Sequence, residues 1–358
     1  MEKRLDARLT DLPPASFHGL AGRISAVDEC KGWWKGGGHS HRSVLARMKK
    51  RTITVSSDAA ERIAAKISFP SPNRHPWERG RPGTGQAERA RRAGYAELLR
   101  SVFEGHRDME FGQNLILRFH DRLFRYSAAD RDHRGRYKTS PDKRSTVPGG
   151  WMESLSLRPT EPHLVPGEME ILTRWTAARL AAPDFHPLFV TAAFLLEFLA
   201  IRPFADGNGR MGRILANFLL LKSGYEYVPY VSLDGIIADR GADYLIALRK
   251  AQAKRNFPRP DITPWLTAFL EVARAQAWEL RAVLEKRPGE YLLSGNQRAV
   301  LSLLDRHGEV SIRLVRSELG IPRDTAKQVL RRLYDMNLVL RSGGGRATRY
   351  LRLPLSPG

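Results

Sequence analysis

Apolar residues recur at helical spacing along most of the chain. Leu98, Leu99 and Phe103 share one face of a helical segment at 87–105, and a second such segment follows at 112–126. Longer apolar stretches bounded by polar residues predict further helices at about 168–182, 187–200, 207–223, 240–254 and 262–286. The pattern therefore predicts a mainly α protein with an all-helical core.

The regions before and between these helices have a different character. Residues 1–86 begin with helical spacing and include a second helical segment at about 41–51. Prolines and glycines at 69–86 predict a loop or linker, and the polar stretch at 127–168 predicts a short hairpin among loops. We expect an N-terminal helical region, followed at 87–290 by a helical core domain that carries this short β-hairpin.

The pattern changes again at 295–358, which we expect to be a separate domain. Three short amphipathic helices, one starting near 295 and the others at 311–318 and 323–336, precede two strand-like pieces at 338–341 and 349–352. Three glycines separate the two strands. The order of helix, helix, Gly turn, helix and two strands predicts a winged helix-turn-helix.

The chain of 358 residues carries 59 Lys or Arg and 38 Asp or Glu, a formal net charge of +21. This balance points to a polyanion such as nucleic acid or a nucleotide, and a merely basic surface is the alternative. A hydrophobic fraction of 42% excludes wholesale disorder, and Cys30 as the single cysteine excludes an internal disulfide. Without a leader-like or 18-residue apolar stretch, we expect a cytoplasmic protein with no membrane partner.

The most informative stretch joins two of the apolar helices at 201–213. Its chemistry-bearing residues are Asp206, Gly207, Asn208, Gly209, Arg210 and Arg213. The glycines let several backbone N–H groups point into one concavity at a helix N-terminus, where the helix dipole favours an anion. The two arginines share a helix face and can clamp phosphate oxygens, while the carboxylate suits Mg²⁺ that bridges phosphates. The alternative is that these residues only cap the helix and that their charged side chains lie in solvent. The combination of carboxylate, glycine turn and paired arginines favours a phosphate site.

The same stretch resembles the motif of the Fic family, His-Pro-Phe-x-Asp/Glu-Gly-Asn-Gly-Arg-x-x-Arg. Every fixed position is met except the first, where Arg202 replaces the family's catalytic His. Segments at 94–99, 133–139 and 227–230 resemble other parts of the family, and the C-terminal unit resembles the winged helix often appended to it. Fic proteins typically transfer AMP from Mg-ATP to a Ser, Thr or Tyr hydroxyl of a target protein.

The resemblance implies a role for each matched residue. Asp206 would hold Mg²⁺, the residues from Gly207 to Arg210 would bind phosphates of ATP, and Arg213 would take the γ-phosphate. A hairpin flap within 136–158 would align the target protein. The family's His takes the proton of the acceptor hydroxyl, which a permanently protonated arginine cannot do. General-base catalysis, worth roughly 10²–10⁴-fold, is therefore expected to be absent.

Three interpretations of Arg202 stay open. In the first, the protein binds a nucleotide and Mg²⁺ but is altered or inactive in AMP transfer, and Arg202 is a third cation beside the phosphates. In the second, the protein is an active adenylyltransferase, or an enzyme of related phosphoryl or nucleotidyl transfer, in which another group such as His186 or His163 acts as base. In the third, Arg202 is an engineered or sporadic substitution in an ordinary enzyme. We favour the first.

Many relatives carry an inhibitory helix with the motif Ser/Thr-x-x-x-Glu-Gly/Asn, whose Glu pairs with the second Arg of the main motif. The corresponding stretch here, from Ser56 to Ala65, has Ala64 and Ala65 where Glu and Gly are expected. Arg213 is therefore expected to lack its intramolecular partner, although Glu61 could take over part of that role. The absence of the inhibitory glutamate favours the interpretation that catalysis is altered.

Cations are found in both parts of the C-terminal unit that would meet DNA: Arg323, Lys327 and Arg331 in the last helix, and Arg346 and Arg349 in the wing. The whole unit contains 12 Lys or Arg and 5 Asp or Glu. We expect the helix to enter the major groove of duplex DNA while the wing contacts phosphates. Docking of another protein is the alternative, and a homodimer is compatible with either.

Overall fold

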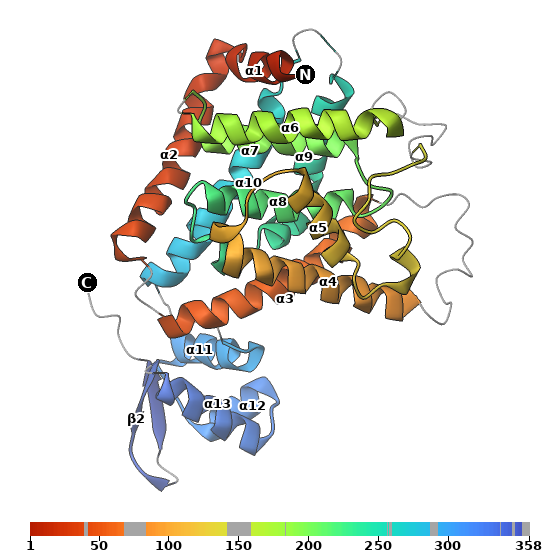
Figure 1. The fold of residues 1–358 in the computed structure, drawn as a ribbon. Helices are drawn as coiled ribbons and strands as arrows, with labels where there is room; N and C mark the ends of the chain where they lie inside the picture. The colour runs from red at the N-terminus through yellow and green to blue at the C-terminus, as the bar shows by residue number, and fades with distance from the viewer. Residues whose placement is uncertain are drawn as a thin grey trace. The chain divides into compact units, whose positions relative to one another are not determined.

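The computed structural model contains two compact units (Figure 1). One consists of residues 1–39 and 48–280, and the other of residues 40–47 and 281–358. The residues that the structure describes are 1–38, 42–67, 84–141, 159–182, 184–255, 257, 260–286, 293–336, 338–345 and 348–352.

The first unit is built from helices. These are α1 (Glu2–Thr10), α2 (Phe17–Trp33), α3 (Arg42–Ile67, in this unit from Met48 on), α4 (Thr84–Gly105), α5 (Gln113–Leu123), α6 (Val165–Ala181), α7 (Pro187–Ile201), α8 (Asn208–Lys222), α9 (Leu233–Ala253) and α10 (Thr263–Arg281, in this unit up to Leu280). The mainly α fold predicted from the apolar pattern is confirmed. Two boundaries differ from the prediction. The segment at 41–51 continues to Ile67, and the helix at 240–254 begins at Leu233, because the Ser232 side chain caps it by accepting the Gly235 N–H at 2.9 Å.

Helices α7 and α8 lie in the middle of the first unit (Figure 1), and α7 packs against α6, α8 and α9. Helix α7 is apolar on every face, which is typical of a buried helix, and Phe194 and Phe198 are fully buried in it. Its one carboxylate, Glu197, is also fully buried. Among the described helices, none combines the length and the apolar character needed to cross a membrane.

The connection between α5 and α6 is described only in part. Up to residue 141 it contains a short 3₁₀ turn at Ala128–Asp130 and bends, and no strand lies in this described part. Residues 142–158, with most of the expected hairpin flap, lie outside the described residues. The same is true of residues 68–83, where a linker is expected.

The second unit combines short helices with a small antiparallel sheet. Its elements are α11 (Gly295–His307), β1 (Glu309–Val310), α12 (Ile312–Leu319), α13 (Arg323–Asp335), β2 (Val339–Ser342) and β3 (Arg349–Arg352). The strand order is β1-β3-β2. In the central strand β3, Tyr350 lies opposite Val310 of β1 on one side and opposite Arg341 of β2 on the other. Strand β1 was not predicted, because two residues are too short to show a period of two.

Local sequence signals explain the boundaries of these helices. Ser294 and Gln297 form a capping box at the start of α11. Gly320, with a φ of 63°, ends α12 in the left-handed conformation that glycine adopts without strain. The predicted apolar face of α13 is confirmed by the burial of Ala326, Leu330 and their neighbours in the core of this unit.

Candidate functional site

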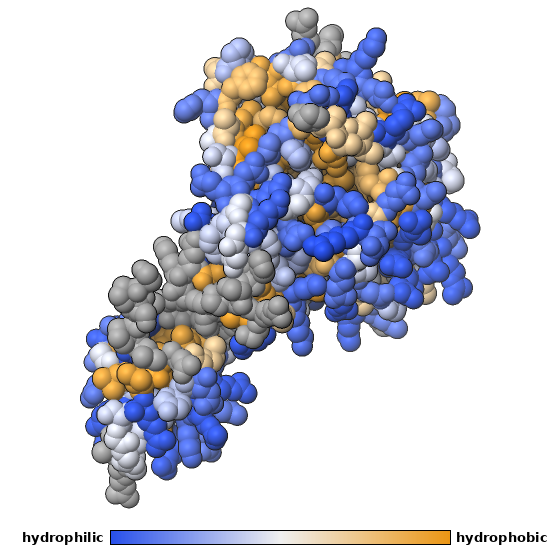
Figure 2. All heavy atoms as spheres, turned by 60° about the vertical axis from the view of Figure 1, so that its left-hand side comes forward, coloured by the Kyte–Doolittle hydropathy of each residue, from blue (hydrophilic) through white to orange (hydrophobic). Residues whose placement is uncertain are grey.

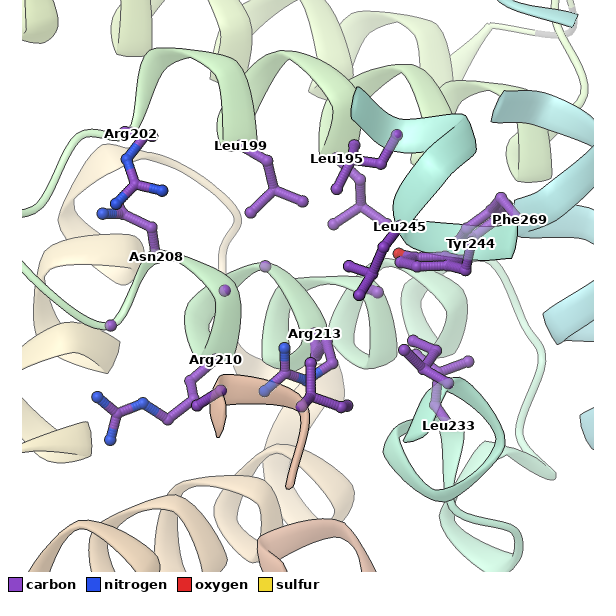
Figure 3. A pocket seen from close by; sticks show the side chains of 18 of the residues that line it. Leu195, Leu199, Arg202, Asn208, Arg210, Arg213, Leu233, Tyr244, Leu245 and Phe269 are labelled. Atoms are coloured by element: carbon purple, nitrogen blue, oxygen red, sulfur yellow. The ribbon is translucent and has the colours of Figure 1, made fainter. Parts of the chain in front are cut away.

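A cavity of about 160 Å³ lies in the first unit between α7, α8 and α9 (Figure 3). One part of its lining is apolar and includes Leu195, Leu199, Leu233, Tyr244, Leu245 and Phe269. The other part contains the residues that the sequence singled out: Arg202, Asp206, Gly207, Asn208, Gly209, Arg210 and Arg213. The fold therefore brings all of the expected phosphate-site residues of the motif to one cavity.

The loop between α7 and α8 is held rigidly. Phe204 is fully buried and stacks on His120 with ring centroids 3.8 Å apart. The Asn208 side chain accepts the N–H of Phe204 at 3.0 Å and donates to its carbonyl at 2.7 Å. The Asn208 amide is thus engaged within the loop, and the group that it can offer to a ligand is its backbone N–H.

Helix α8 starts directly at the cavity. Gly207 precedes it with a φ of 79°, and no side chain caps the helix. The first intrahelical bond runs from the Met211 N–H to the Gly207 carbonyl at 2.8 Å. The earlier N–H groups of the first turn have no acceptor within the helix, so they are available to an anion in the cavity.

Arg210 is a buried cation with unused donor capacity. Its Nη2 lies 3.4 Å from Asp206 Oδ2, and its Nη1 lies 4.0 Å from Glu61 Oε1. That Nη1 is buried and has no hydrogen-bond acceptor among the described residues. Burial lowers the pKa of Arg210, although Asp206 and Glu61 oppose the shift. An anion that entered the cavity would offset the free-energy cost of burying the charge of Arg210.

The expectation that Arg213 lacks an intramolecular partner is wrong. Its Nε donates to Asp234 Oδ1 at 2.5 Å, and the Tyr95 hydroxyl donates to the same oxygen at 2.7 Å. Asp234 is fully buried at the start of α9. Burial alone would lower the pKa of Arg213, but the Asp234 carboxylate raises it. Sequence reasoning missed Asp234 because no spacing rule relates it to the motif.

Helix α3, which contains the stretch compared with the inhibitory helix, contributes to the cavity lining. Ile63 and Ala64 line the cavity, and Ala64 offers no charge there. The carboxylate one turn earlier, Glu61, approaches Arg210 and not Arg213. Glu61 therefore does not take the role that the comparison considered for it.

The C-terminal end of α7 carries a second unusual feature. Arg202 has a φ of 49°, and among the described residues it is the one non-glycine residue with a positive φ. Arg249 of α9 lines the same cavity. Its pKa is lowered by burial and then by the positive charge of Arg202. Arg249 was not predicted, although its position four residues after Leu245 places both on one helix face.

Among the described residues, no histidine lines the cavity. His186 caps the opposite end of α7, about 24 Å from Arg202 by helix rise, and bonds to Asp28 at 2.9 Å. His163 is exposed and does not line the cavity. The two histidines considered as replacement bases are thus not at the site, and His186 caps the start of α7 by accepting the Leu188 N–H.

The sequence of the first unit matches known proteins. Residues 97–220 match the sequence profile of the Fic/DOC family. A Fido domain-containing protein of Dictyostelium discoideum is 43% identical over 65 residues, which are 18% of this chain and 41% of that protein. A protein named protein adenylyltransferase Fic, from Aedes aegypti, is 39% identical over 66 residues, which are 18% of this chain and 13% of that protein. The chain thus matches less than half the length of these relatives.

The fold has a counterpart among solved structures. A crystal structure of a Fic family protein from Desulfovibrio desulfuricans G20 superposes with a TM-score of 0.56 at 20% identity, covering 97% of this chain and 98% of that one. At this identity the likeness concerns the fold. Taken with the sequence match over residues 97–220, it shows that this part of the chain is a Fic domain.

Proposed function

We propose that this protein binds ATP with Mg²⁺ in the α7–α8–α9 cavity and is altered or inactive in AMP transfer. The observation that supports this most directly is the cavity lining, which contains Gly207 to Arg210 at the uncapped start of α8 together with Arg213, but has Arg202 where the family motif has its His. The relatives named protein adenylyltransferases make ATP the natural nucleotide to test.

The phosphates would be held by three kinds of group. The free N–H groups at the start of α8 face the cavity, Arg210 has a buried Nη1 without an acceptor among the described residues, and Arg213 is fixed by Asp234. Because Arg213 uses its Nε for Asp234, its Nη1 lies near Gly209, 3.5 Å from the position that a Cβ would take there. Arg213 is thereby oriented towards the start of α8.

Asp206 fits the role of a magnesium ligand. Its carboxylate lines the cavity and is 27% exposed. One carboxylate is enough for this role, because Mg²⁺ beside a nucleotide is held by one or two carboxylates together with substrate phosphates. Bound Mg²⁺ would neutralise phosphate charge, while Asp206 would set its place.

Arg202 changes the chemistry of this site. It cannot accept a proton from a hydroxyl, and among the described residues the cavity contains no histidine to replace it. Burial raises the pKa of Tyr244, so that this phenol is not a base at neutral pH. The site retains the groups that bind a nucleotide and lacks the group that activates an acceptor.

ATP carrying the label in its AMP moiety tests this proposal. With Mg²⁺, we expect Arg202→His to label itself or an added protein at least about 100-fold faster than the unaltered chain, as regained general-base catalysis implies. Arg202→Gln is the matched control, because it removes the same charge without adding a base, and it should not gain labelling. Strong labelling by the unaltered chain that Asp206→Ala abolishes would contradict inactivity. Failure of calorimetry to detect ATP binding would contradict the binding site itself.

We further propose that the second unit is a winged helix that binds duplex DNA. Its support is the element order α11, β1, α12, α13, β2 and β3 with a three-stranded sheet. Arg323, Lys327 and Arg331 are exposed on α13 at intervals of four residues, which forms one stripe. Figure 2 shows hydrophilic residues over much of the visible surface of this unit.

Among the described residues, the wing has one of its two expected arginines. Arg349 is exposed on β3 and lies 3.6 Å from Glu309, so part of its charge is engaged. Arg346 lies outside the described residues.

A gel-shift assay with duplex DNA tests this second proposal. Arg323→Ala with Lys327→Ala should weaken binding about tenfold or more and reduce its salt dependence, because two phosphate or base contacts are lost. Arg298→Ala with Arg306→Ala is the matched control, since it removes two exposed charges from α11 of the same unit. Equal losses in both pairs would indicate only non-specific attraction, and binding that persists after deletion of 295–358 would exclude this unit as the binder.

A further inference from the structure

We propose that Arg91 is a fixed positive charge beside Asp206 that offsets part of the charge Mg²⁺ would otherwise neutralise, so that nucleotide affinity depends only weakly on this metal. The proposal rests on the nucleotide site proposed above and concerns how the metal regulates that site. Arg91 belongs to α4 and is not part of the cavity lining. It is therefore a positioning residue that acts on a ligand through Asp206.

Helix packing brings Arg91 to the motif. Helix α4 packs against α5 and α8, and Arg91 Nη2 lies 3.9 Å from Asp206 Oδ2. Arg210 Nη2, from α8, lies 3.4 Å from the same oxygen. The other carboxylate oxygen, Oδ1, accepts the Gly207 N–H at 2.7 Å. Because the loop backbone engages Oδ1, a metal would coordinate Oδ2, which two guanidinium groups already approach.

A buried carboxylate holds Arg91 in this place. The Nε and Nη2 atoms of Arg91 each donate to one oxygen of Asp130 at 3.0 Å, a two-point geometry that binds a guanidinium firmly. Asp130 is 4% exposed and also accepts from the Ser127 hydroxyl at 2.5 Å. The ring of Phe124 lies beside the guanidinium, with its centroid 5.9 Å from Arg91 Cζ. Arg91 therefore cannot move away from Asp206 without losing these contacts.

The two arginines beside Asp206 differ in how they can respond to a ligand. Arg210 lines the cavity, and its buried Nη1 has no acceptor among the described residues, so it can donate to a phosphate. Arg91 donates to Asp130 instead. Burial alone would lower the pKa of Arg91, but Asp130 and then Asp206 raise it. When a phosphate chain engages Arg210, the charge of Arg91 stays beside Asp206.

This fixed charge acts oppositely on the two ways of filling the site. When phosphates enter without a metal, Arg91 offsets part of their repulsion by the Asp206 carboxylate. When Mg²⁺ binds at Asp206 Oδ2, the same guanidinium repels it. Unit charges about 4 Å apart near a protein surface interact strongly enough for both effects to be measured. Arg91 thus raises the affinity for metal-free nucleotide and lowers the affinity for Mg²⁺.

Calorimetry with the full chain and ATP, once with Mg²⁺ and once with a chelator, tests the proposal. For the unaltered chain we expect the two dissociation constants to differ by less than about tenfold. Arg91→Gln should widen this difference about tenfold or more, because metal-free binding weakens and binding with Mg²⁺ strengthens. Arg91→Lys, which keeps the charge without the two-point bond to Asp130, should give an intermediate difference.

Arg92→Gln is the matched control, because it removes the same charge from the next position of α4. Arg92 pairs with Asp58 at 3.1 Å and Glu88 at 3.4 Å, neither of which belongs to the motif. This variant should leave the difference unchanged. Thermal melts without ligand show whether each variant is folded, and Arg91→Lys carries the test if Arg91→Gln is not.

Two results would overturn the role of Arg91 while nucleotide binding stands. One is a change of both dissociation constants by the same factor in Arg91→Gln, and the other is an unaltered chain that binds ATP measurably only with Mg²⁺. If ATP binds in neither condition, the proposed function itself fails.

Discussion

His120 shows how a single side chain supports the site without lining it. Its Nδ1 accepts the Gly135 N–H at 2.9 Å, and its Nε2 lies 3.2 Å from the Asp206 carbonyl. These contacts suit a neutral ring that carries its proton on Nε2. Burial lowers the pKa of His120 to about 4, partly opposed by the Asp206 carbonyl. The ring therefore fixes the backbone of Asp206 from outside the cavity lining.

The pKa of His120 predicts a pH dependence of stability. In the unfolded chain His120 takes up a proton near pH 6.5, whereas in the folded chain it stays neutral down to about pH 4. The unfolded state thus binds more protons between these pH values. The contribution of His120 to the stability of the folded state is therefore complete above pH 6.5 and is lost as the pH falls. Between pH 7.5 and 5.5 we expect His120 to account for a loss of about 1.4 kcal/mol.

Urea denaturation at the two pH values measures this loss. His120→Gln, which can still donate and accept but does not titrate, should show a smaller fall in the free energy of unfolding than the unaltered chain. The same fall in both proteins would show that other groups cause the pH dependence.

At the scale of one element, the start of α8 depends on a glycine. Gly207 has a φ of 79°, and a Cβ at this position would lie 2.8 Å from the Phe124 ring. Gly209, in the first turn of the helix, has no positive φ, and a Cβ there would make an ordinary contact with Arg213 at 3.5 Å. The two glycines of the motif therefore serve different purposes: Gly207 permits the backbone conformation, and Gly209 lines the cavity without a side chain.

Alanine substitutions separate these purposes. Gly207→Ala should destabilise the first unit by about 1–2 kcal/mol from backbone strain alone, and the clash with Phe124 adds to this. Gly209→Ala should leave stability unchanged or raise it by up to about 1 kcal/mol, because alanine is the better helix former. It should nevertheless weaken ATP binding, since Gly209 lines the cavity. Thermal melts and calorimetry measure the two effects, and equal destabilisation by both would contradict this division.

At the scale of the whole molecule, buried Glu197 ties distant parts of the first unit together. It accepts from Arg8 at 2.7 Å, Arg4 at 2.9 Å and Arg255 at 2.8 Å. These partners connect α1 and the end of α9 to α7. Burial alone would raise the pKa of Glu197, but Arg255, Arg8 and Arg4 together lower it. The cluster therefore stabilises the fold above the usual glutamate pKa and loses this effect on acidification.

Removal of this one charge should affect the whole first unit. Glu197→Gln leaves three arginines without their carboxylate and is expected to cost about 3–5 kcal/mol of unfolding free energy. Glu2→Gln is the matched control, because Glu2 forms an exposed pair with Arg174 and such pairs contribute about 0–1 kcal/mol. Denaturation monitored by tryptophan fluorescence compares the unfolding free energies of the two variants. A cost below 1 kcal/mol for Glu197→Gln would show that the cluster is not a stabilising link.

Much of the fold could be predicted because its signals are local. The periodic apolar positions located the helices from α4 to α8 closely, and the motif located the residues that meet at the start of α8. The prediction was less accurate where a cap or a pairing determines the boundary, as at Ser232 for α9 and at the short strand β1. Periodicity contains no information about either.

The sequence alone indicated which motif residues meet at the cavity and that one of them is an arginine at position 202, because the motif is contiguous and its chemistry follows from residue type. Only the tertiary structure decided which other charged residues lie beside those of the motif. Asp234 neutralises Arg213, Arg249 joins Arg202 at the cavity, and both come from α9, more than twenty residues after the motif. Pairing of buried charges depends on which helices pack together, and no local spacing encodes that packing.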